Sequence, residues 1–309
     1  MKKLGGFVRV AVAVAMVPVV LVQQGLAWGS DGHMLINRVV GEMLPKEVPE
    51  FLRSGAAQNA LAYYGPEPDR WRGRGEPELS KASAPDHFMD MEYADMVGEL
   101  PRDRYEFVRA LVPVQAAHPD LPLTAERVGM QPYQTVELWE RLKSAMRDYR
   151  ALKLANQDTK PVEGEIVFLT GWLGHYVADG SMPLHTSINY NGWTGPNPNG
   201  YTVDHKIHAL FESDFVKANV KAKDVTPLVV KEPVLVGDVF TDYMKYLRHS
   251  NSLVEKTYQL EKAGAFIGAG SAEGKAFVDE RLAAGATELR DLIYTAWVRS
   301  AEPVPAYKP

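Results

Sequence analysis

Two short stretches of the sequence place a histidine and a carboxylate four residues apart. His175 and Asp179 form the pair in "HYVADGSMPLH", and His208 and Glu212 form the pair in "HALFE". Residues four apart lie on one face of a helix, so each pair could hold a metal ion. Imidazole nitrogen and carboxylate oxygen without sulfur suit zinc, and also manganese or iron.

A third histidine lies between the two pairs. Pro183 should end the first helix, so that His185 would turn away toward a second ion. A lone histidine–carboxylate pair is usually a surface ion pair, but two pairs with a histidine between them favour a metal site. His205, close to the second pair, is a weaker candidate, and His118 and His249 are expected to be surface residues.

Three upstream stretches carry further candidate ligands. His87 lies between two aspartates in "APDHFMDME", and Asp69 lies beside arginines in "PEPDRWR". In "AWGSDGH", cleavage after Ala27 would make Trp28 the first residue, with His33 close by. A free α-amino group and its own carbonyl oxygen can chelate a metal, so Trp28 is a candidate ligand. The alternative is a tryptophan that packs into the core.

Residues 1–27 are predicted to be a secretory signal peptide. Basic side chains precede an apolar run at 10–22 that is too short to span a bilayer comfortably, and small residues precede the cut. An uncleaved anchor is the alternative. We therefore expect an exported protein, secreted or periplasmic in a bacterium. Its functional domain should cover 28–309, with a disordered tail from about 301, no transmembrane segment, no protein partner and a monomeric state.

The composition is that of an ordinary globular protein, with 46% hydrophobic and 24% charged residues. The formal net charge of −5 argues against a broad cationic surface for nucleic acid. The chain has no cysteine, which excludes disulfides and thiolate metal ligands.

Helices are the elements that must position these residues. Apolar side chains step by three and four, as one helix face should, at 139–149 and again at 282–297. A nearly continuous apolar run at 166–173 predicts a central helix that is buried on every side. The expected fold is all-α, in a single domain.

Other segments are predicted to be irregular. Stretches at 63–78 and 189–201 are rich in Gly, Pro or Asn and should be loops. The stretch at 228–237 has a strand-like composition, but Pro233 interrupts it.

Taken together, the ligand blocks resemble the trinuclear zinc phosphodiesterases, a superfamily that includes bacterial zinc-dependent phospholipase C and the fungal and plant single-strand nucleases. The blocks are "WGSDGH", "PDRWR", "DHFMD", "HYVADGSMPLH" and "HALFE", and they follow the family order. The resemblance implies a single helical domain with a cluster of three zinc ions at the bottom of a cleft.

The resemblance also implies which residues bind each ion, with Asp179 bridging two of them. One zinc would be held by Asp69, His87, His175 and Asp179, a second by Trp28 (amino group and carbonyl), His33 and Asp179, and the third by His185, His208 and Glu212. The sequence departs from the family at Ala178 and Met182, where glycine and glutamine are usual, and neither change removes a ligand.

The implied activity is hydrolysis of a phosphodiester by a metal-activated hydroxide. Arg72 could hold a phosphate, and Phe88 and Asp90 match positions that bind a nucleobase in the nuclease branch, so a nuclease acting on single-stranded DNA or RNA is the main expectation. Glu212 and Asp31 instead match the phospholipase C branch. Asp31 is a candidate catalytic base or substrate-pocket carboxylate, or else a helix N-cap. An exported metal-binding protein without catalysis is a third reading.

Overall fold

The computed structural model describes residues 28–73 and 75–304 of the chain. The predicted signal peptide lies outside the described residues. Among the residues described there is no β-strand, only two isolated bridges, between Met89 and Gly129 and between Tyr190 and Gly192. The protein is therefore all-α, as predicted.

The helices, with the short 3-10 and π turns as η, follow one another along the chain. They are α1 (Gly29–Met43), α2 (Glu50–Arg53), α3 (Gly55–Tyr64), α4 (Glu67–Gly73), α5 (Pro77–Ser83), η1 (Ala84–His87), α6 (Met91–Ala94), η2 (Asp95–Val97), α7 (Arg104–Ala117), α8 (Ala125–Val128), α9 (Gln131–Leu154), α10 (Lys160–Ser181), η3 (Pro183–Thr186), α11 (Ile207–Ala209), η4 (Leu210–Asp214), α12 (Phe215–Asn219), α13 (Ala222–Val225), η5 (Thr226–Leu228), α14 (Val239–Asn251), α15 (Val254–Lys262) and α16 (Ala272–Arg299).

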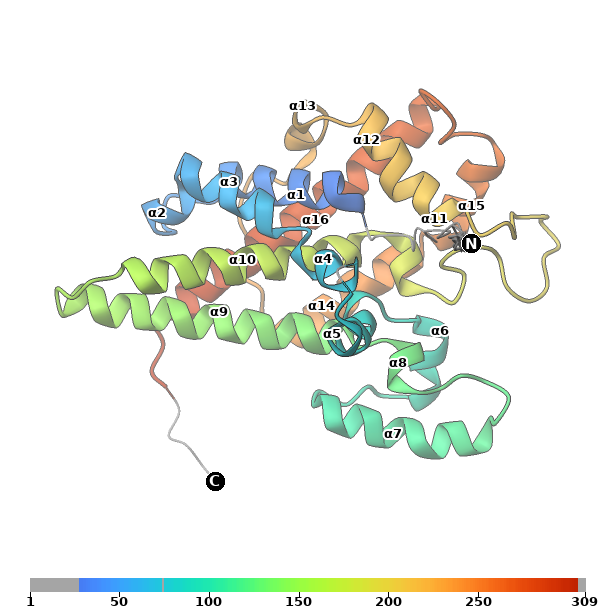
Figure 1. Ribbon diagram of the computed structural model, residues 1–309, viewed down its shortest axis with the longest axis horizontal. Coiled ribbons are helices and arrows are strands. Elements are labelled where there is room, and N and C mark those ends of the chain that lie inside the picture. The colour runs from blue at the N-terminus through green and yellow to red at the C-terminus, as the bar shows by residue number, and fades with distance from the viewer. Residues whose placement is uncertain (1–27, 74, 305–309) are drawn as a thin grey trace, which may run out of the picture.

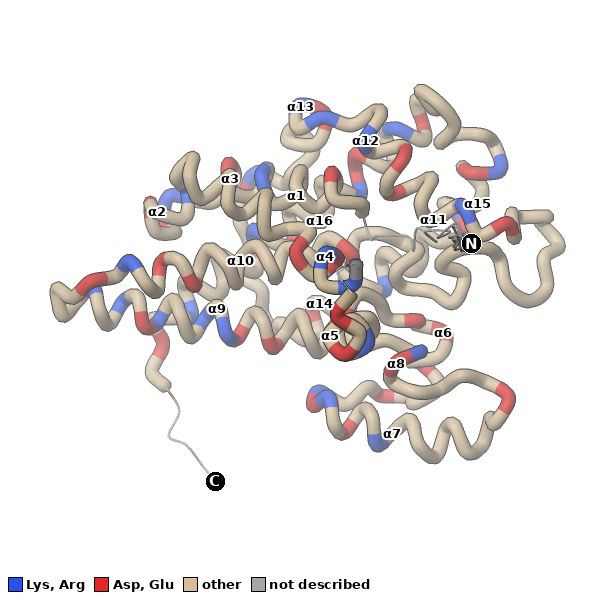
Figure 2. Tube along the Cα trace, viewed as in Figure 1, with Lys and Arg blue, Asp and Glu red and all other residues tan. Residues whose placement is uncertain are grey.

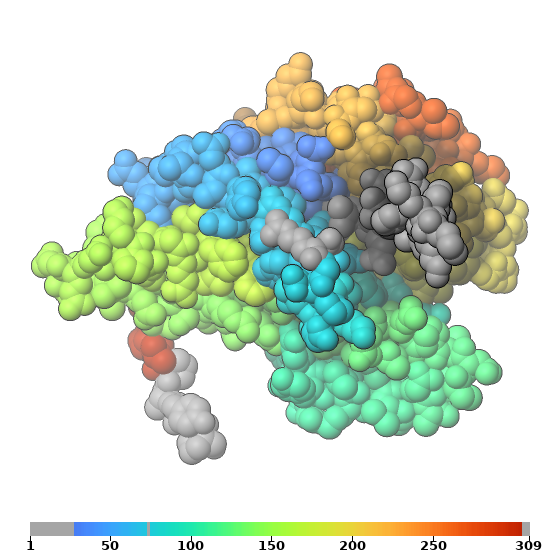
Figure 3. Space-filling model, viewed as in Figure 1, coloured from blue at the N-terminus to red at the C-terminus, as the bar shows by residue number. Residues whose placement is uncertain are grey.

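Helix α10 is the centre of the fold. It pairs along its length with α9 as a helical hairpin, and it also contacts α1, α3, α14 and α16 (Figure 1). In the space-filling view, α4 and α5 form the surface between this bundle and the lobe that contains α7 (Figure 3). None of the helices described is both long and apolar enough to cross a bilayer.

The predicted helix faces are confirmed on α9 and α16. Trp139, Leu142 and Met146 are buried on α9, and Leu282 and Leu289 are buried on α16. These faces pack against each other and against α10, which explains why a period of three and four was visible in both stretches.

The apolar run at 166–173 does lie in a helix, but that helix is buried on every side only from 173 to 181. Val167, Phe168 and Trp172 remain partly exposed. The C-terminal half of α10 is enclosed because α14 donates hydrogen bonds to its backbone and α1 and α16 approach its glycine and serine positions closely. The prediction was therefore right about the helix and displaced in its position.

Side-chain caps explain where several helices begin. The carboxylate of Asp103 accepts hydrogen bonds from the first turn of α7, and Asp238 does the same for α14. Ser54 and Ser271 cap α3 and α16 in the same way. Such caps satisfy backbone N–H groups that have no partner within the helix.

The prediction of a loop at 63–78 was wrong, because α4 and α5 occupy most of this stretch. Pro77 lies at the start of α5, where its missing N–H costs no hydrogen bond. Glu67 and Asp69 lie in the first turn of α4, where a negative charge is favourable. Prolines that suggested a loop are thus helix-initiating residues.

The other irregular segments behave as predicted. Residues 189–201 contain no helix. The stretch at 228–237 forms no strand and runs along α16, where Val234 N–H donates to Asp291 and Val236 N–H donates to Thr295. Helix α16 ends at Arg299, and 301–304 are exposed. Residues 305–309 lie outside the described residues, and disorder of the tail stays a prediction.

Candidate metal centre

The structure brings together all the side chains that were predicted to bind metal. Every one of them is buried, and together they come from seven elements of the fold: His33 on α1, Asp69 on α4, His87 on η1, His175 and Asp179 on α10, His185 on η3, His208 on α11 and Glu212 on η4. Their ligand atoms form three groups that could each hold an ion.

Asp179 lies between two sets of histidines. Its Oδ1 is 3.3 Å from Nε2 of His33. Its Oδ2 is 3.2 Å from Nδ1 of His87 and 3.4 Å from Nε2 of His175. The two carboxylate oxygens therefore face different histidines, which is the arrangement that a bridging ligand needs.

Asp69 is placed in a similar way. Its Oδ2 is 3.9 Å from Nε2 of His33, and its Oδ1 is 3.8 Å from Nδ1 of His87 and 3.9 Å from Nε2 of His175. The resemblance assigned Asp69 to one ion only. The geometry places it within reach of both sets of histidines.

The third group is built where α10 ends. The helix stops at Ser181, and the 3-10 turn that starts at Pro183 carries His185 away from the first two groups, as the proline predicted. Nε2 of His185 is 3.5 Å from Oε2 of Glu212, and Nε2 of His208 is 3.2 Å from the same oxygen. Glu212 lies in a π turn, a feature often found at functional sites.

Backbone carbonyls orient three of the histidine rings. Nδ1 of His175 donates to the carbonyl of Gly65 at 2.8 Å, Nδ1 of His185 to that of His87 at 2.8 Å, and Nδ1 of His208 to that of Tyr190 at 2.9 Å. Each bond leaves Nε2 directed at the carboxylates. Metal-binding histidines are held in this manner because the carbonyl fixes both the ring and its tautomer.

Trp28 is fully buried, with 0% of its surface exposed. Its indole Nε1 donates to the carbonyl of Ala178 at 2.7 Å and to Oγ of Ser181 at 3.0 Å, and its ring packs on Phe211. Trp28 and Gly29 both have positive φ, 32° and 44°, so the chain turns sharply into α1. The side chain packs into the core, and in doing so it fixes this residue next to α10.

Burial makes the first two groups costly to charge without a cation. It raises the pKa of Asp69 to about 7 and the pKa of Asp179 well above its usual range. It lowers the pKa of His87 and of His175 well below the usual range. Both oxygens of Asp69 and Oδ1 of Asp179 are buried without a hydrogen-bond partner.

In the third group, burial alone would raise the pKa of Glu212, but the facing His208 and His185 lower it. Burial alone would lower the pKa of His208, but Glu212 raises it, so the two residues form a buried imidazole–carboxylate pair whose proton a metal ion would displace. Imidazole nitrogens and buried carboxylate oxygens are the ligand set that a zinc ion takes. The residues present therefore fit zinc.

The predicted substrate residues differ in their position. Arg72 is 19% exposed, and its Nη1 is 3.8 Å from Oδ1 of Asp69. Phe88 is half-buried next to His87. Asp90 is 7% exposed, and burial raises its pKa to about 8.

Asp31 is exposed and belongs to none of the three groups. It lines a surface hollow between α1 and α12–α13, together with Arg38 and Lys217. It is also not the N-cap of α1, since Trp28 holds that position and makes no side-chain cap. Asp31 lies in the first helical turn, where its charge suits the helix dipole. Its catalytic role stays a prediction.

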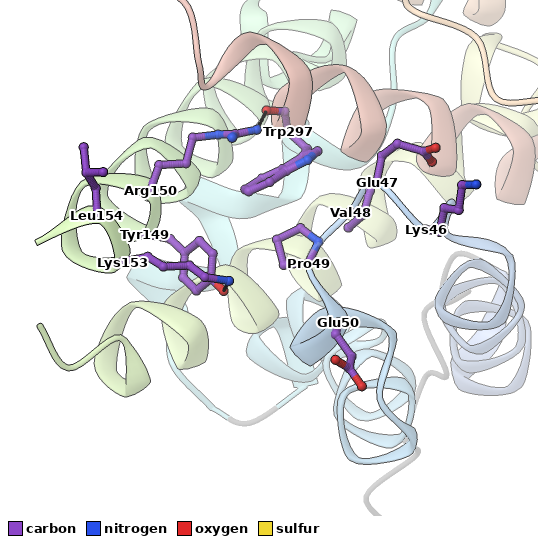
Figure 4. Close-up of a pocket in the computed structure, with 10 residues that line it drawn as sticks. All are labelled: Lys46, Glu47, Val48, Pro49, Glu50, Tyr149, Arg150, Lys153, Leu154 and Trp297. Carbon is purple, nitrogen blue, oxygen red and sulfur yellow. Dashed lines mark hydrogen bonds between the residues drawn. The ribbon is translucent and has the colours of Figure 1, made fainter. Parts of the chain in front are cut away.

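A second hollow, of about 650 Å³, lies between the segment at 46–50 and the ends of α9 and α16 (Figure 4). Its wall includes Trp297, with the Arg150 guanidinium 3.4 Å from the ring centroid. No predicted ligand lines either hollow. The cleft expected above the zinc cluster stays a prediction.

Several residues that support the site carry no signal in the spacing of the motifs. Gln131 is buried and donates from Nε2 to the carbonyls of His87 and Tyr176. A Cβ at Gly65 would lie 2.8 Å from the carbonyl oxygen of His33, so only glycine fits there.

His205, the weaker candidate ligand, belongs to none of the three groups. Its ring is exposed and forms a hydrogen bond with the carbonyl of Asn191.

No protein-family model matches the chain, and no curated protein sequence matches it. Two solved structures are similar to it. The alpha toxin of Clostridium absonum aligns with a TM-score of 0.42 and 12% identity, covering 91% of this chain and 67% of the toxin. The alpha-toxin of an avian strain of Clostridium perfringens aligns with a TM-score of 0.41 and 14% identity, covering 89% of this chain and 64% of the toxin. The chain thus spans about two-thirds of the length of these toxins.

Proposed function

We propose that this protein is an exported zinc-dependent phosphodiester hydrolase. The observation that carries the proposal is Asp179, whose two oxygens face different histidines beside a third group of ligands. Zinc bound there would lower the pKa of a water molecule and polarise an oxygen of the phosphate. Three ions are expected, one for each group of ligands.

The protein side chains have separate tasks in this proposal. The buried histidines and carboxylates hold the ions, and Trp28 adds its amino group and carbonyl once the signal peptide is removed. That carbonyl also accepts the Gly32 N–H at 3.0 Å, and its second lone pair is left for a metal. Arg72, partly exposed beside Asp69, would bind an oxygen of the substrate phosphate.

We favour a phospholipid headgroup ester as the substrate, as in phospholipase C. Proteins that hold single strands combine a positively charged groove with stacking aromatics. Lysines and arginines are instead interspersed with acidic residues along the chain, and the net charge is −5 (Figure 2). Asp90 is almost fully buried, which leaves little of it to read a base. The glutamate at 212 also matches the phospholipase C branch.

A single-strand nuclease is the second candidate. Its support is the half-buried Phe88 next to His87, together with Arg72 beside Asp69. Stacking on one aromatic ring and one phosphate clamp would suffice for a nucleotide at the end of a strand.

The test uses the mature protein, cut after Ala27, on phosphatidylcholine vesicles, single-stranded DNA, RNA and a 3′-nucleotide, with and without a chelator. We expect chelator-sensitive release of the phosphorylated headgroup. Cleavage of nucleic acid without cleavage of phospholipid would show that the protein is a nuclease and not a phospholipase. Three bound zinc ions with no hydrolysis of any substrate would indicate the non-catalytic metal-binding protein instead. Asp179→Asn serves as the matched inactive variant.

A further inference from the structure

The loop at 187–206 holds His208 at two points. The carbonyl oxygen of Tyr190 accepts the hydrogen bond from the His208 ring at 2.9 Å. Oδ1 of Asn191 accepts the backbone N–H of His208 at 3.3 Å. The dipeptide 190–191 therefore sets both the ring orientation and the backbone position of this ligand.

A buried hydroxyl on another helix fixes the two ends of that dipeptide. The hydroxyl of Tyr258, on α15, donates to the carbonyl of Asn189 at 2.6 Å. The same hydroxyl accepts the N–H of Gly192 at 2.9 Å. These are the residues immediately before and after Tyr190 and Asn191. The clamp is therefore one side-chain oxygen that hydrogen-bonds to the residues on both sides of the dipeptide, and the dipeptide hydrogen-bonds to His208.

The clamp has a defined position because Tyr258 is itself fixed. Its side chain is fully buried. Its ring packs edge-on against Trp193, with 5.2 Å between centroids, and lies tilted against Tyr201, with 5.6 Å between centroids. Burial raises the pKa of Tyr258 to about 12, so the hydroxyl stays protonated and can donate. Gly192 has φ of 125°, a conformation that only glycine adopts readily, so the backbone at this end of the dipeptide depends on glycine.

We propose that Tyr258 is a positioning residue for the metal group formed by His185, His208 and Glu212. The proposal rests on the proposed function, because it assumes that this group binds zinc. Without the hydroxyl, the carbonyl of Asn189 and the N–H of Gly192 lose their partner. The bonds that remain, from Asn189 to Ser187 and from His205 to the Asn191 carbonyl, come from the same loop and do not tie it to a helix. The ring of His208 would then sample orientations in which its Nε2 does not meet Glu212.

The test is Tyr258→Phe, which removes one oxygen and keeps the ring. Zinc affinity is measured by competition with a chromogenic chelator, and stoichiometry by elemental analysis of the mature protein. We expect the affinity for one zinc ion to fall about tenfold, while the other two are unchanged, because outer partners of a metal ligand act through that ligand alone. The unfolding midpoint of the metal-free protein should fall, because the Asn189 carbonyl and the Gly192 N–H lose their partner, so the zinc affinities are compared at a temperature where both proteins are fully folded.

Tyr133→Phe is the matched control, since it also removes a buried hydroxyl that donates to a backbone carbonyl, that of Pro101. It should leave all three zinc affinities unchanged. Asn191→Ala removes the acceptor of the His208 backbone N–H, so it should lower the affinity for the same zinc ion. In the double variant with Tyr258→Phe, the loss of zinc affinity should be smaller than the sum of the losses in the two single variants.

The outcomes separate this proposal from the proposed function. Wild-type protein that binds fewer than three zinc ions would overturn the proposed function. Wild-type protein with three ions and Tyr258→Phe with three unchanged affinities would overturn the role of Tyr258 alone. Equal weakening of all three ions, or equal loss in the Tyr133→Phe control, would also overturn it, because both indicate general destabilisation.

Discussion

Trp28 combines two roles that one pair of variants can separate. Its indole is a core residue, and its amino group is a proposed zinc ligand in the mature protein. Trp28→Phe alters the side chain and keeps the amino group. One alanine inserted before Trp28 alters the amino group and keeps the side chain. The two variants should therefore fail in different assays.

The size of the first effect follows from the contacts. The indole Nε1 donates to the carbonyl of Ala178 and to Oγ of Ser181, at 2.7 and 3.0 Å. Each bond contributes about 0.5–1.5 kcal/mol net, and the lost ring atoms about 1 kcal/mol of apolar burial. Trp28→Phe should thus lower the free energy of unfolding of the metal-free protein by about 2–4 kcal/mol. The inserted alanine should leave that free energy within about 0.5 kcal/mol.

Urea unfolding of both variants measures the first effect, and zinc content measures the second. The inserted alanine should reduce bound zinc by one ion, whereas Trp28→Phe should retain full zinc content under folding conditions. Full zinc content and activity in the insertion variant would refute the amino-group ligand. An unfolding free energy unchanged in Trp28→Phe would refute the reasoning from its hydrogen bonds.

Three further changes test other parts of the structure. Asp179→Asn keeps the shape of the side chain and removes the charge that faces two sets of histidines. Elemental analysis should show less zinc, and turnover should be abolished. Retained turnover would contradict the role of Asp179 as a bridging ligand. Arg72→Ala should lower kcat/KM by about 10²-fold with zinc content unchanged, and Arg72→Lys should recover part of the lost activity. A kcat/KM of Arg72→Ala equal to that of the wild type would show that Arg72 does not bind the substrate. Burial raises the pKa of Glu288 to about 8, against about 4.3 in the unfolded chain, so wild-type stability should fall as pH rises between these values. Glu288→Gln should remove up to about 4 kcal/mol of that dependence in urea unfolding at pH 5 and pH 9. Parallel curves for the two proteins would show that Glu288 is not the cause.

The sequence predicted the parts of the site that depend on local geometry. The spacing of His175 and Asp179 places both on one face of α10 because the helical period does so in any helix. Pro183 ends that helix for an equally local reason, and His185 turns away as a result. The helix faces of α9 and α16 were visible because burial follows the same period.

Other features could not be read from the sequence because they arise only from tertiary packing. A proline at a helix start and a proline in a loop look the same in the sequence, so the prolines at the starts of α4 and α5 led to a wrong prediction of a loop. Asp69 lies near His33 as well as His87, and this position depends on how α4 packs against α1 and η1. The carbonyls of Gly65 and Tyr190 accept histidine N–H groups, but a carbonyl is present at every residue and gives no motif.

Two hydrogen bonds, one from a side chain and one from the backbone, link the first and third metal groups. Nδ1 of His185 donates to the carbonyl of His87, and the N–H of Met89 donates to the carbonyl of His185. A shift of the segment 87–89 would therefore reach both groups at once. The loop that holds His208 is bonded at its start to Glu92, through Ser187 and Ile188, and further along to Tyr258 on α15. Because the segment next to Tyr258 contacts only His208 among the predicted ligands, a change at Tyr258 should weaken one zinc ion, whereas a change at 87–89 should disturb the whole centre.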